Sequence, residues 1–155
     1  MSGQKVMEIK YEEASYYGQV KVNSNGEAIR QGLGSMYYTS GRYYEGYWSE
    51  GLRQGKGFEK FEIEDASLQN SSYQSKSNIY DGDYHEGKAH GKGIYRWHNG
   101  EVYTGDWKEG LRDGNGQWIA TNNESYQGDW VGGKPHGYGV YNWENGNLVV
   151  IKLFR

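Results

Sequence analysis

Aromatic residues and glycines alternate with polar residues over short stretches of this chain. Tyr103, Gly105 and Trp107 stand two positions apart, and polar residues occupy the positions between them. A period of two residues is that of a β-strand with one apolar face. Tyr95 and Trp97 continue this period in another stretch that begins with glycines, so the pattern predicts pairs of β-strands.

The same pattern recurs along the chain. Tyr80, Tyr103 and Tyr126 each begin a segment in which a glycine follows after two residues and an aromatic residue after four, with starting points 23 residues apart. An earlier copy begins at Tyr44, and a degenerate first copy begins at Tyr16. Self-similarity at a fixed period of this length indicates a repeat protein. The sequence therefore predicts five tandem repeats, over residues 16–43, 44–79, 80–102, 103–125 and 126–146.

The segments outside the repeats are predicted to be capping strands, which repeat arrays require at their ends. Residues 1–15 hold a short alternation of apolar and charged residues. In residues 147–155, Ile151 stands where the pattern would place a glycine, between Val149 and Leu153. A further hairpin cannot stack on a strand altered in this way.

Two repeats carry insertions. Five extra residues fall within residues 22–30 of the first repeat, and 13 extra residues fall near residues 64–77 of the second. The second insertion is polar and rich in serine, which predicts a surface loop.

Glycine and asparagine mark the predicted turns. Gly110 and Gly114 are expected to enclose a tight turn formed by the three residues between them. Asn-Gly is the strongest short signal for a two-residue type I′ turn, and asparagine also tolerates positive φ. Such turns are predicted where Asn-Gly or Asn-Asn follows a second strand, at residues 99–100, 122–123 and 145–146.

The predicted fold class is all-β: a single-layer, twisted antiparallel meander sheet of about five tandem β-hairpins. The composition, with 25 Gly, 16 Tyr and 6 Trp but 3 Phe, does not suit a thick aliphatic core. A single layer can bury an aromatic ring against the bare backbone of a neighbouring strand glycine. The glycines expected to serve in this way are Gly46, Gly57, Gly82, Gly93, Gly105, Gly116, Gly128 and Gly139.

The titratable residues do not form a recognisable catalytic or metal-binding set. Asp83, Asp106 and Asp129 recur at one position of each repeat, whereas a catalytic acid is normally unique. His90 and His136 likewise occupy equivalent turn positions, and the chain has no cysteine. We therefore expect structural roles for these residues, and no catalytic residue, metal or cofactor.

Net charge and hydropathy limit which partners and which cellular location are expected. The net charge is −3 and the basic residues are scattered, which argues against a nucleic-acid partner. No apolar run reaches the ~18 residues of a membrane span. Residues 1–10 contain no apolar stretch typical of a secretion signal, so a cytoplasmic location is expected.

The segments between Tyr80 and Gly146 follow the pattern Tyr-x-Gly-x-Trp-x-x-Gly-Lys-x-x-Gly-x-Gly and resemble the membrane occupation and recognition nexus (MORN) repeat family. The resemblance covers nearly the whole chain from Tyr16, although Val20 replaces the tryptophan in the first repeat and the second carries its insertion. Proteins with these repeats look like elongated, twisted sheets. The resemblance implies protein–protein contacts, dimerisation, cytoskeletal or ciliary assembly and, in some cases, a link to membrane lipids.

One face of such a sheet is expected to carry a trough of aromatic rings that binds a helix or an extended peptide of a protein partner. The sheet edges offer a second route, through self-association. The residues predicted to form the partner-binding face are Tyr44, Trp48, Tyr80, Tyr84, Tyr95, Trp97, Tyr103, Trp107, Trp118, Tyr126, Trp130, Tyr141 and Trp143.

The function predicted from these features is that of a non-catalytic scaffold, a small subunit of a cytoskeletal, ciliary or axonemal assembly. The alternative is a peripheral membrane module that binds acidic phospholipids. That alternative needs basic residues gathered on one face. Lys88, Lys92, Arg96 and Lys134 could approach one another, but acidic residues are interleaved with them.

Overall fold

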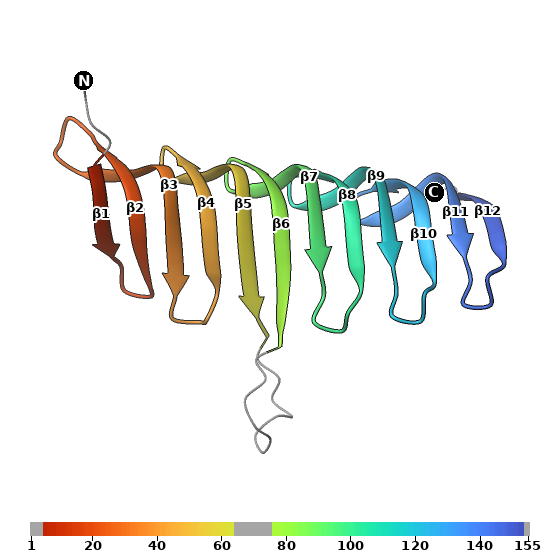
Figure 1. The fold of residues 1–155 in the computed structure, drawn as a ribbon. Helices are drawn as coiled ribbons and strands as arrows, with labels where there is room; N and C mark the ends of the chain where they lie inside the picture. Colours follow the sequence, from red (N-terminus) through yellow and green to blue (C-terminus); the bar gives the residue numbers. More distant parts are fainter. Residues whose placement is uncertain (1–4, 64–75, 154–155) are drawn as a thin grey trace, which may run out of the picture.

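The chain folds into a single row of antiparallel strands, described by a computed structural model over residues 5–63 and 76–153 (Figure 1). Twelve strands pair in chain order, so the predicted all-β meander sheet is confirmed. Most of the second predicted insertion, residues 64–75, lies outside the described residues. The strands are β1 (Lys5–Lys10), β2 (Ala14–Val22), β3 (Ala28–Tyr38), β4 (Tyr43–Ser49), β5 (Leu52–Glu62), β6 (Ser77–His85), β7 (Lys88–Arg96), β8 (Val102–Lys108), β9 (Leu111–Ile119), β10 (Ser125–Val131), β11 (Lys134–Asn142) and β12 (Leu148–Leu153).

A row of glycines crosses the sheet, because each repeat strand places a glycine opposite a glycine of its neighbour. Gly93 of β7, for example, pairs with Gly82 of β6 and with Gly105 of β8. At the C-terminal end the row stops at Ile151, which pairs with Gly139. All eight glycines singled out from the sequence lie in this row: Gly46, Gly57, Gly82, Gly93, Gly105, Gly116, Gly128 and Gly139.

One tyrosine in each repeat bends over two glycines of this row. A Cβ atom at Gly116 would lie 2.5 Å from Cζ of Tyr103, a distance at which the ring or the backbone would have to move. The Tyr103 hydroxyl donates a hydrogen bond of 2.9 Å to the carbonyl of Asp106. Burial raises the pKa of Tyr103 to about 12, so this hydroxyl stays protonated at neutral pH. The equivalent tyrosines donate to the carbonyl three residues later in the same way: Tyr16, Tyr44, Tyr80 and Tyr126.

These tyrosines belong to a continuous ladder of rings that forms the core of the described residues. Neighbouring rings meet edge to face, with centroids 5.0 to 5.5 Å apart, which is a preferred aromatic geometry. The Trp107 indole N–H also donates to the carbonyl of Gly93 at 3.2 Å, so the polar atom of a buried ring is satisfied. In order along the sheet the rings are Tyr16, Trp48, Tyr44, Tyr84, Tyr80, Trp107, Tyr103, Trp130 and Tyr126.

The turns within the repeats differ from the prediction. Glu109 and Gly110 have φ of 51° and 85°, and these two residues form the connection between β8 and β9 with the positive φ angles of a type I′ turn. Leu111 already pairs with Lys108, so the predicted turn over residues 111–113 is wrong. Gly114, with φ of 114°, lies inside β9, where the register with β8 shifts at a bulge.

The turns between the repeats are longer than the predicted two residues. The Trp97 N–H donates to the carbonyl of Glu101 at 3.0 Å, so the loop contains three residues, and Gly100 alone of these has positive φ. The type I′ prediction is therefore wrong at residues 99–100. The Asn99 side chain accepts a hydrogen bond from the Glu101 N–H, an arrangement typical of asparagine in turns. Asn123 takes the positive-φ position in the fourth repeat, with φ of 66°.

We expect Gly116→Ala to destabilise the fold by about 1–3 kcal/mol, because the new methyl group displaces the Tyr103 ring from a tightly packed position. Urea unfolding followed by tryptophan fluorescence measures the loss. Gly132→Asn is the matched control, since no atom lies within 4 Å of a Cβ at this turn glycine and asparagine tolerates its φ of 56°. Equal stability of the two variants would contradict the ring-over-glycine packing.

Candidate interaction surface

The thirteen aromatic residues predicted to bind a partner share one face of the sheet, but most of them are interior. Trp107 is 8% exposed and Trp130 is 3% exposed, so neither ring presents more than a small part of its surface to a partner. Rings of the same repeat and of an adjacent repeat pack against them: Trp107, for example, contacts Tyr103 and Tyr80. The eight predicted residues that are buried in the ladder are Tyr44, Trp48, Tyr80, Tyr84, Tyr103, Trp107, Tyr126 and Trp130.

The other five form what we call the aromatic stripe: Tyr95, Trp97, Trp118, Tyr141 and Trp143. They come from the second strand of a repeat or from the residue that follows it. Tyr95 and Trp97 are ring neighbours with centroids 4.7 Å apart, and Tyr141 and Trp143 repeat this pair at 4.6 Å. Trp143 is 48% exposed, and the other four are partly buried against the core. The stripe is thus the open part of the predicted face.

In the last two repeats, a glutamate two positions before the core tyrosine holds the polar atom of a stripe ring. Glu101 accepts a hydrogen bond of 3.0 Å from the Trp118 indole, and Glu124 accepts one of 3.0 Å from the Tyr141 hydroxyl. In both pairs the two residues lie 17 positions apart in the sequence. These bonds fix the orientation of Trp118 and Tyr141.

In the second repeat, an ion pair takes the place of the hydrogen bond between a glutamate and a stripe ring, and its two residues are again 17 positions apart in the sequence. Glu59 stands in β5 where the later repeats have a stripe ring, and it is 2% exposed. The Arg42 Nε, 17 residues earlier, donates to the Glu59 carboxylate at 2.6 Å, and Arg53 donates to it at 2.5 Å. Its second oxygen accepts a hydrogen bond of 2.7 Å from the Tyr84 hydroxyl. The acid is therefore satisfied by three donors, as a buried carboxylate must be.

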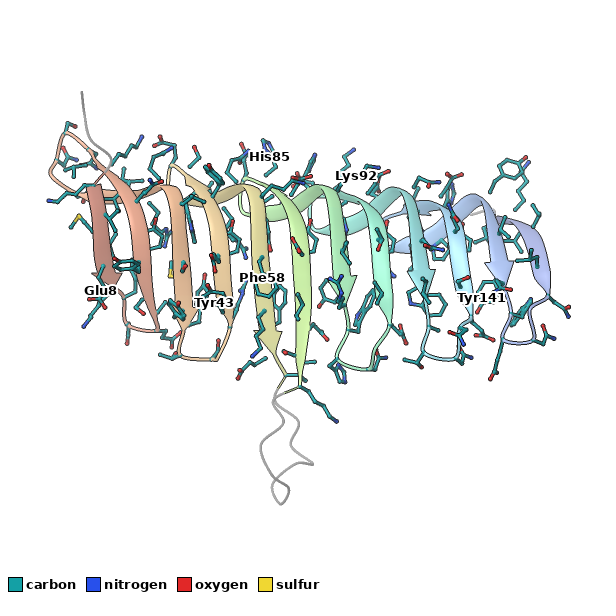
Figure 2. The ribbon with its side chains drawn as sticks, in the orientation of Figure 1. Glu8, Tyr43, Phe58, His85, Lys92 and Tyr141 are labelled. Carbon is teal, nitrogen blue, oxygen red and sulfur yellow. The ribbon has the colours of Figure 1, made fainter. Side chains whose placement is uncertain are left out.

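The opposite face of the sheet carries charged residues in pairs. Lys92, which projects near the upper margin of Figure 2, binds Asp106 at 2.5 Å. Asp106 also accepts a hydrogen bond of 2.9 Å from the Asn115 N–H, just after the bulge at Gly114. The hydrogen bond from Lys92 is the main reason that the pKa of Asp106 is held below its usual value.

The repeated acids therefore support the bulges. Asp83 and Asp129 accept the N–H of Lys92 and Tyr138, just as Asp106 accepts that of Asn115. The described residues contain no group of three or more histidines, cysteines, aspartates or glutamates that could hold a metal ion. In the same part of the chain, no helix is long and apolar enough to cross a membrane.

The two edge strands differ in character. The N-terminal edge, β1, carries charged side chains, and its Lys10 lies 3.8 Å from Glu8. The C-terminal edge, β12, is mostly aliphatic: Leu148 is exposed and Val150 is 77% exposed. Charges protect an edge strand from pairing with another chain, whereas an exposed apolar edge invites it.

The MORN repeat profile matches residues 44–63, 80–102, 103–124 and 126–148, more than half of the chain. The chain therefore belongs to the MORN repeat family, and the predicted resemblance is confirmed. A search of curated proteins found no match. Repeats of this family are non-enzymatic modules that commonly mediate interactions with proteins or membranes. The first repeat, residues 16–43, is not among the matches, yet β2 and β3 place Tyr16 over Gly34 as in the other repeats.

The roles of Glu59 and of the arginines that contact the ring ladder were not predicted from the sequence. The sequence does contain a signal for the role of Glu59, which is the one charged residue at its position of the repeat. The other repeats have large apolar residues there: Met36, Tyr95, Trp118 and Tyr141. A column-by-column comparison of the repeats exposes such exceptions.

We expect Glu59→Gln to destabilise the chain by about 3 kcal/mol, because Arg42 and Arg53 then share a neutral partner in a buried site. The double variant Arg42→Glu/Glu59→Tyr recreates the pair formed by Glu124 and Tyr141, and it should recover most of that loss. Urea unfolding measures both effects. A double variant no more stable than Glu59→Gln would refute the equivalence of the two pairs.

Proposed function

We propose that this chain is a small, non-catalytic scaffold that holds a protein partner within a cytoskeletal assembly, with cilia and their axonemes as the setting that the family suggests. The observation that carries the proposal is the aromatic stripe. Partly exposed tyrosine and tryptophan rings, two of them held in fixed orientations by Glu101 and Glu124, are the kind of side chains that dominate protein-binding hot spots.

The spacing of the stripe suits a helical partner. Tyr95, Trp118 and Tyr141 come from β7, β9 and β11, so two strand spacings, about 10 Å, separate one ring from the next. A helix presents every seventh residue on one face at intervals of about 10.5 Å. A helix that lies across the strands can therefore place one apolar residue beside each of these rings.

The pairing of basic side chains with acids weighs against the phospholipid alternative. Binding to an acidic membrane relies on basic side chains that are free to approach lipid phosphates. Lys92 is engaged by Asp106, and Lys88 lies 2.7 Å from Glu109. Binding to acidic liposomes at low salt that is lost at high salt would nevertheless favour the alternative over the scaffold.

The double variant Trp97→Ser/Trp143→Ser should lose most of the partner captured by the wild-type protein from a cytoskeletal fraction of its native source. Trp143 is 48% exposed and Trp97 is only partly buried, and neither ring belongs to the buried ladder, so the fold should survive. Quantitative mass spectrometry of the captured proteins measures the effect.

The matched control is Tyr47→Ser/Tyr138→Ser, which removes two exposed tyrosines from the opposite face. It should capture the same proteins as the wild type. If both double variants keep the same cytoskeletal partners, the stripe is not the binding surface. If the captured set contains no cytoskeletal protein, the proposed setting is wrong.

The scaffold proposal includes self-association through the β12 edge. Sedimentation velocity should show dimers of the wild-type chain, and Val150→Lys should reduce them at least tenfold, because the edge then carries an outward charge. Val6→Lys, at the already charged β1 edge, is the control and should have no effect. A wild-type chain that is monomeric at every concentration would exclude this route.

A further inference from the structure

At three of the junctions between repeats, an arginine of one repeat binds the repeat that follows it. We call such an arginine a clamp. Arg112 donates a hydrogen bond of 2.6 Å to the carbonyl of Gly133, the second residue of the next repeat's turn. Its guanidinium also lies over the next repeat's Trp130, 4.4 Å from the ring centroid. Arg30 makes the same two contacts, with the carbonyl of Gly51 at 2.6 Å and with the Trp48 ring at 4.6 Å; Arg53 makes them with Gly87 and Tyr84.

The third repeat has Ala89 at this position. The equivalence is given by the backbone, since the Gly110 N–H donates to the Ala89 carbonyl at 2.9 Å just as the Gly133 N–H donates to the Arg112 carbonyl at 2.9 Å. The methyl group of alanine can neither reach the Gly110 carbonyl as a donor nor cover the face of Trp107. A hollow of about 240 Å³ is lined by Ala89, Trp107 and Gly110 together with Tyr95 of the aromatic stripe.

We propose that this hollow binds an arginine side chain of a protein partner. The incoming guanidinium stacks on Trp107 and donates to the Gly110 carbonyl, so it supplies the two contacts that Arg30, Arg53 and Arg112 supply within the chain. The inference rests on the proposed scaffold function and deepens it, because it names the side chain that anchors the partner beside the stripe.

The charges around the hollow permit this occupant. Arg42 and Arg53 at its rim are both paired with the buried Glu59, and Lys88 is paired with Glu109. These pairings reduce the repulsion that an incoming cation meets from the three basic side chains. A guanidinium suits the site better than an ammonium group because it is planar, stacks on aromatic faces and is more weakly hydrated.

A second hollow on the same face has a different chemistry. It has a volume of about 380 Å³ and lies where the fifth repeat has Pro135 in the arginine position. Ile151 and Leu153 of β12 line it, in the places where another repeat would supply a glycine and a tryptophan. This hollow therefore lacks the cation-binding ring of a following repeat, and the arginine proposal is confined to Ala89.

The test uses N-acetyl-arginine amide as the probe, titrated into the ¹⁵N-labelled full chain. We expect saturable shifts of the Trp107 indole N–H and of the Leu111 amide, which shares its peptide group with the Gly110 carbonyl. N-acetyl-norleucine amide, which has an unbranched aliphatic side chain without the charge, and N-acetyl-lysine amide should bind at least tenfold more weakly. Equal shifts with either control probe would overturn the proposal.

Two variants locate the binding. Ala89→Arg restores the residue of the other repeats, so it should fold and should abolish the shifts at Trp107. Arg112→Ala opens an equivalent hollow, so the arginine probe should produce new shifts at the Trp130 indole. Shifts at Trp107 that persist in Ala89→Arg, or an absence of shifts in the wild-type chain, would overturn the proposal. The scaffold proposal would survive either result, because its own test depends on Trp97 and Trp143.

Discussion

The packing of a tyrosine ring over two strand glycines is the interaction on which the rest of the structure depends. A single-layer sheet has no second layer to cover its side chains, and the ring solves this by lying on backbone. The Tyr103 ring can take this position only because neither Gly105 nor Gly116 carries a Cβ atom. Its hydroxyl then reaches the Asp106 carbonyl, so even the polar atom of the ring is satisfied at the surface of its own strand. Repetition of this unit brings each tyrosine against the tryptophan or tyrosine of the next repeat and produces the ring ladder.

Where one repeat has a different residue from the others at an equivalent position, the chain has a feature that the other repeats lack. A residue shared by all repeats serves the common sheet, as the bulge-supporting aspartates do. Glu59 departs from the series and gathers Arg42, Arg53 and Tyr84 around a buried charge. Ala89 departs from a series of clamping arginines and leaves a hollow beside Trp107. Both exceptions lie on the ring side of the sheet, where Glu59 and Ala89 line the same hollow.

Periodicity was sufficient to predict the repeats, the meander sheet and the glycine row, because strand alternation places Tyr103, Gly105 and Trp107 on one face whatever the details of packing. Burial could not be predicted in the same way. Trp107 and Trp97 look alike in the pattern, but Trp107 lies in the ring ladder between Tyr80 and Tyr103, whereas Trp97 packs against the ladder from beside it. The turns also escaped prediction, because Gly110 and Gly114 carry the same local signal and only the register shows which of them lies at the turn. The arginine clamps join residues 21 or 34 positions apart, so they become visible only in the folded structure.

The most direct test of the ring-over-glycine account is the proton NMR spectrum of the folded chain. Protons that lie against the face of an aromatic ring are shielded, so the α-protons of Gly34, Gly57, Gly93, Gly116 and Gly139 should resonate far upfield of their positions in the unfolded chain. All five should return to ordinary positions together as the protein unfolds. Glycine α-protons at unfolded positions in the folded protein would contradict the account, because the rings would then not lie on the glycines.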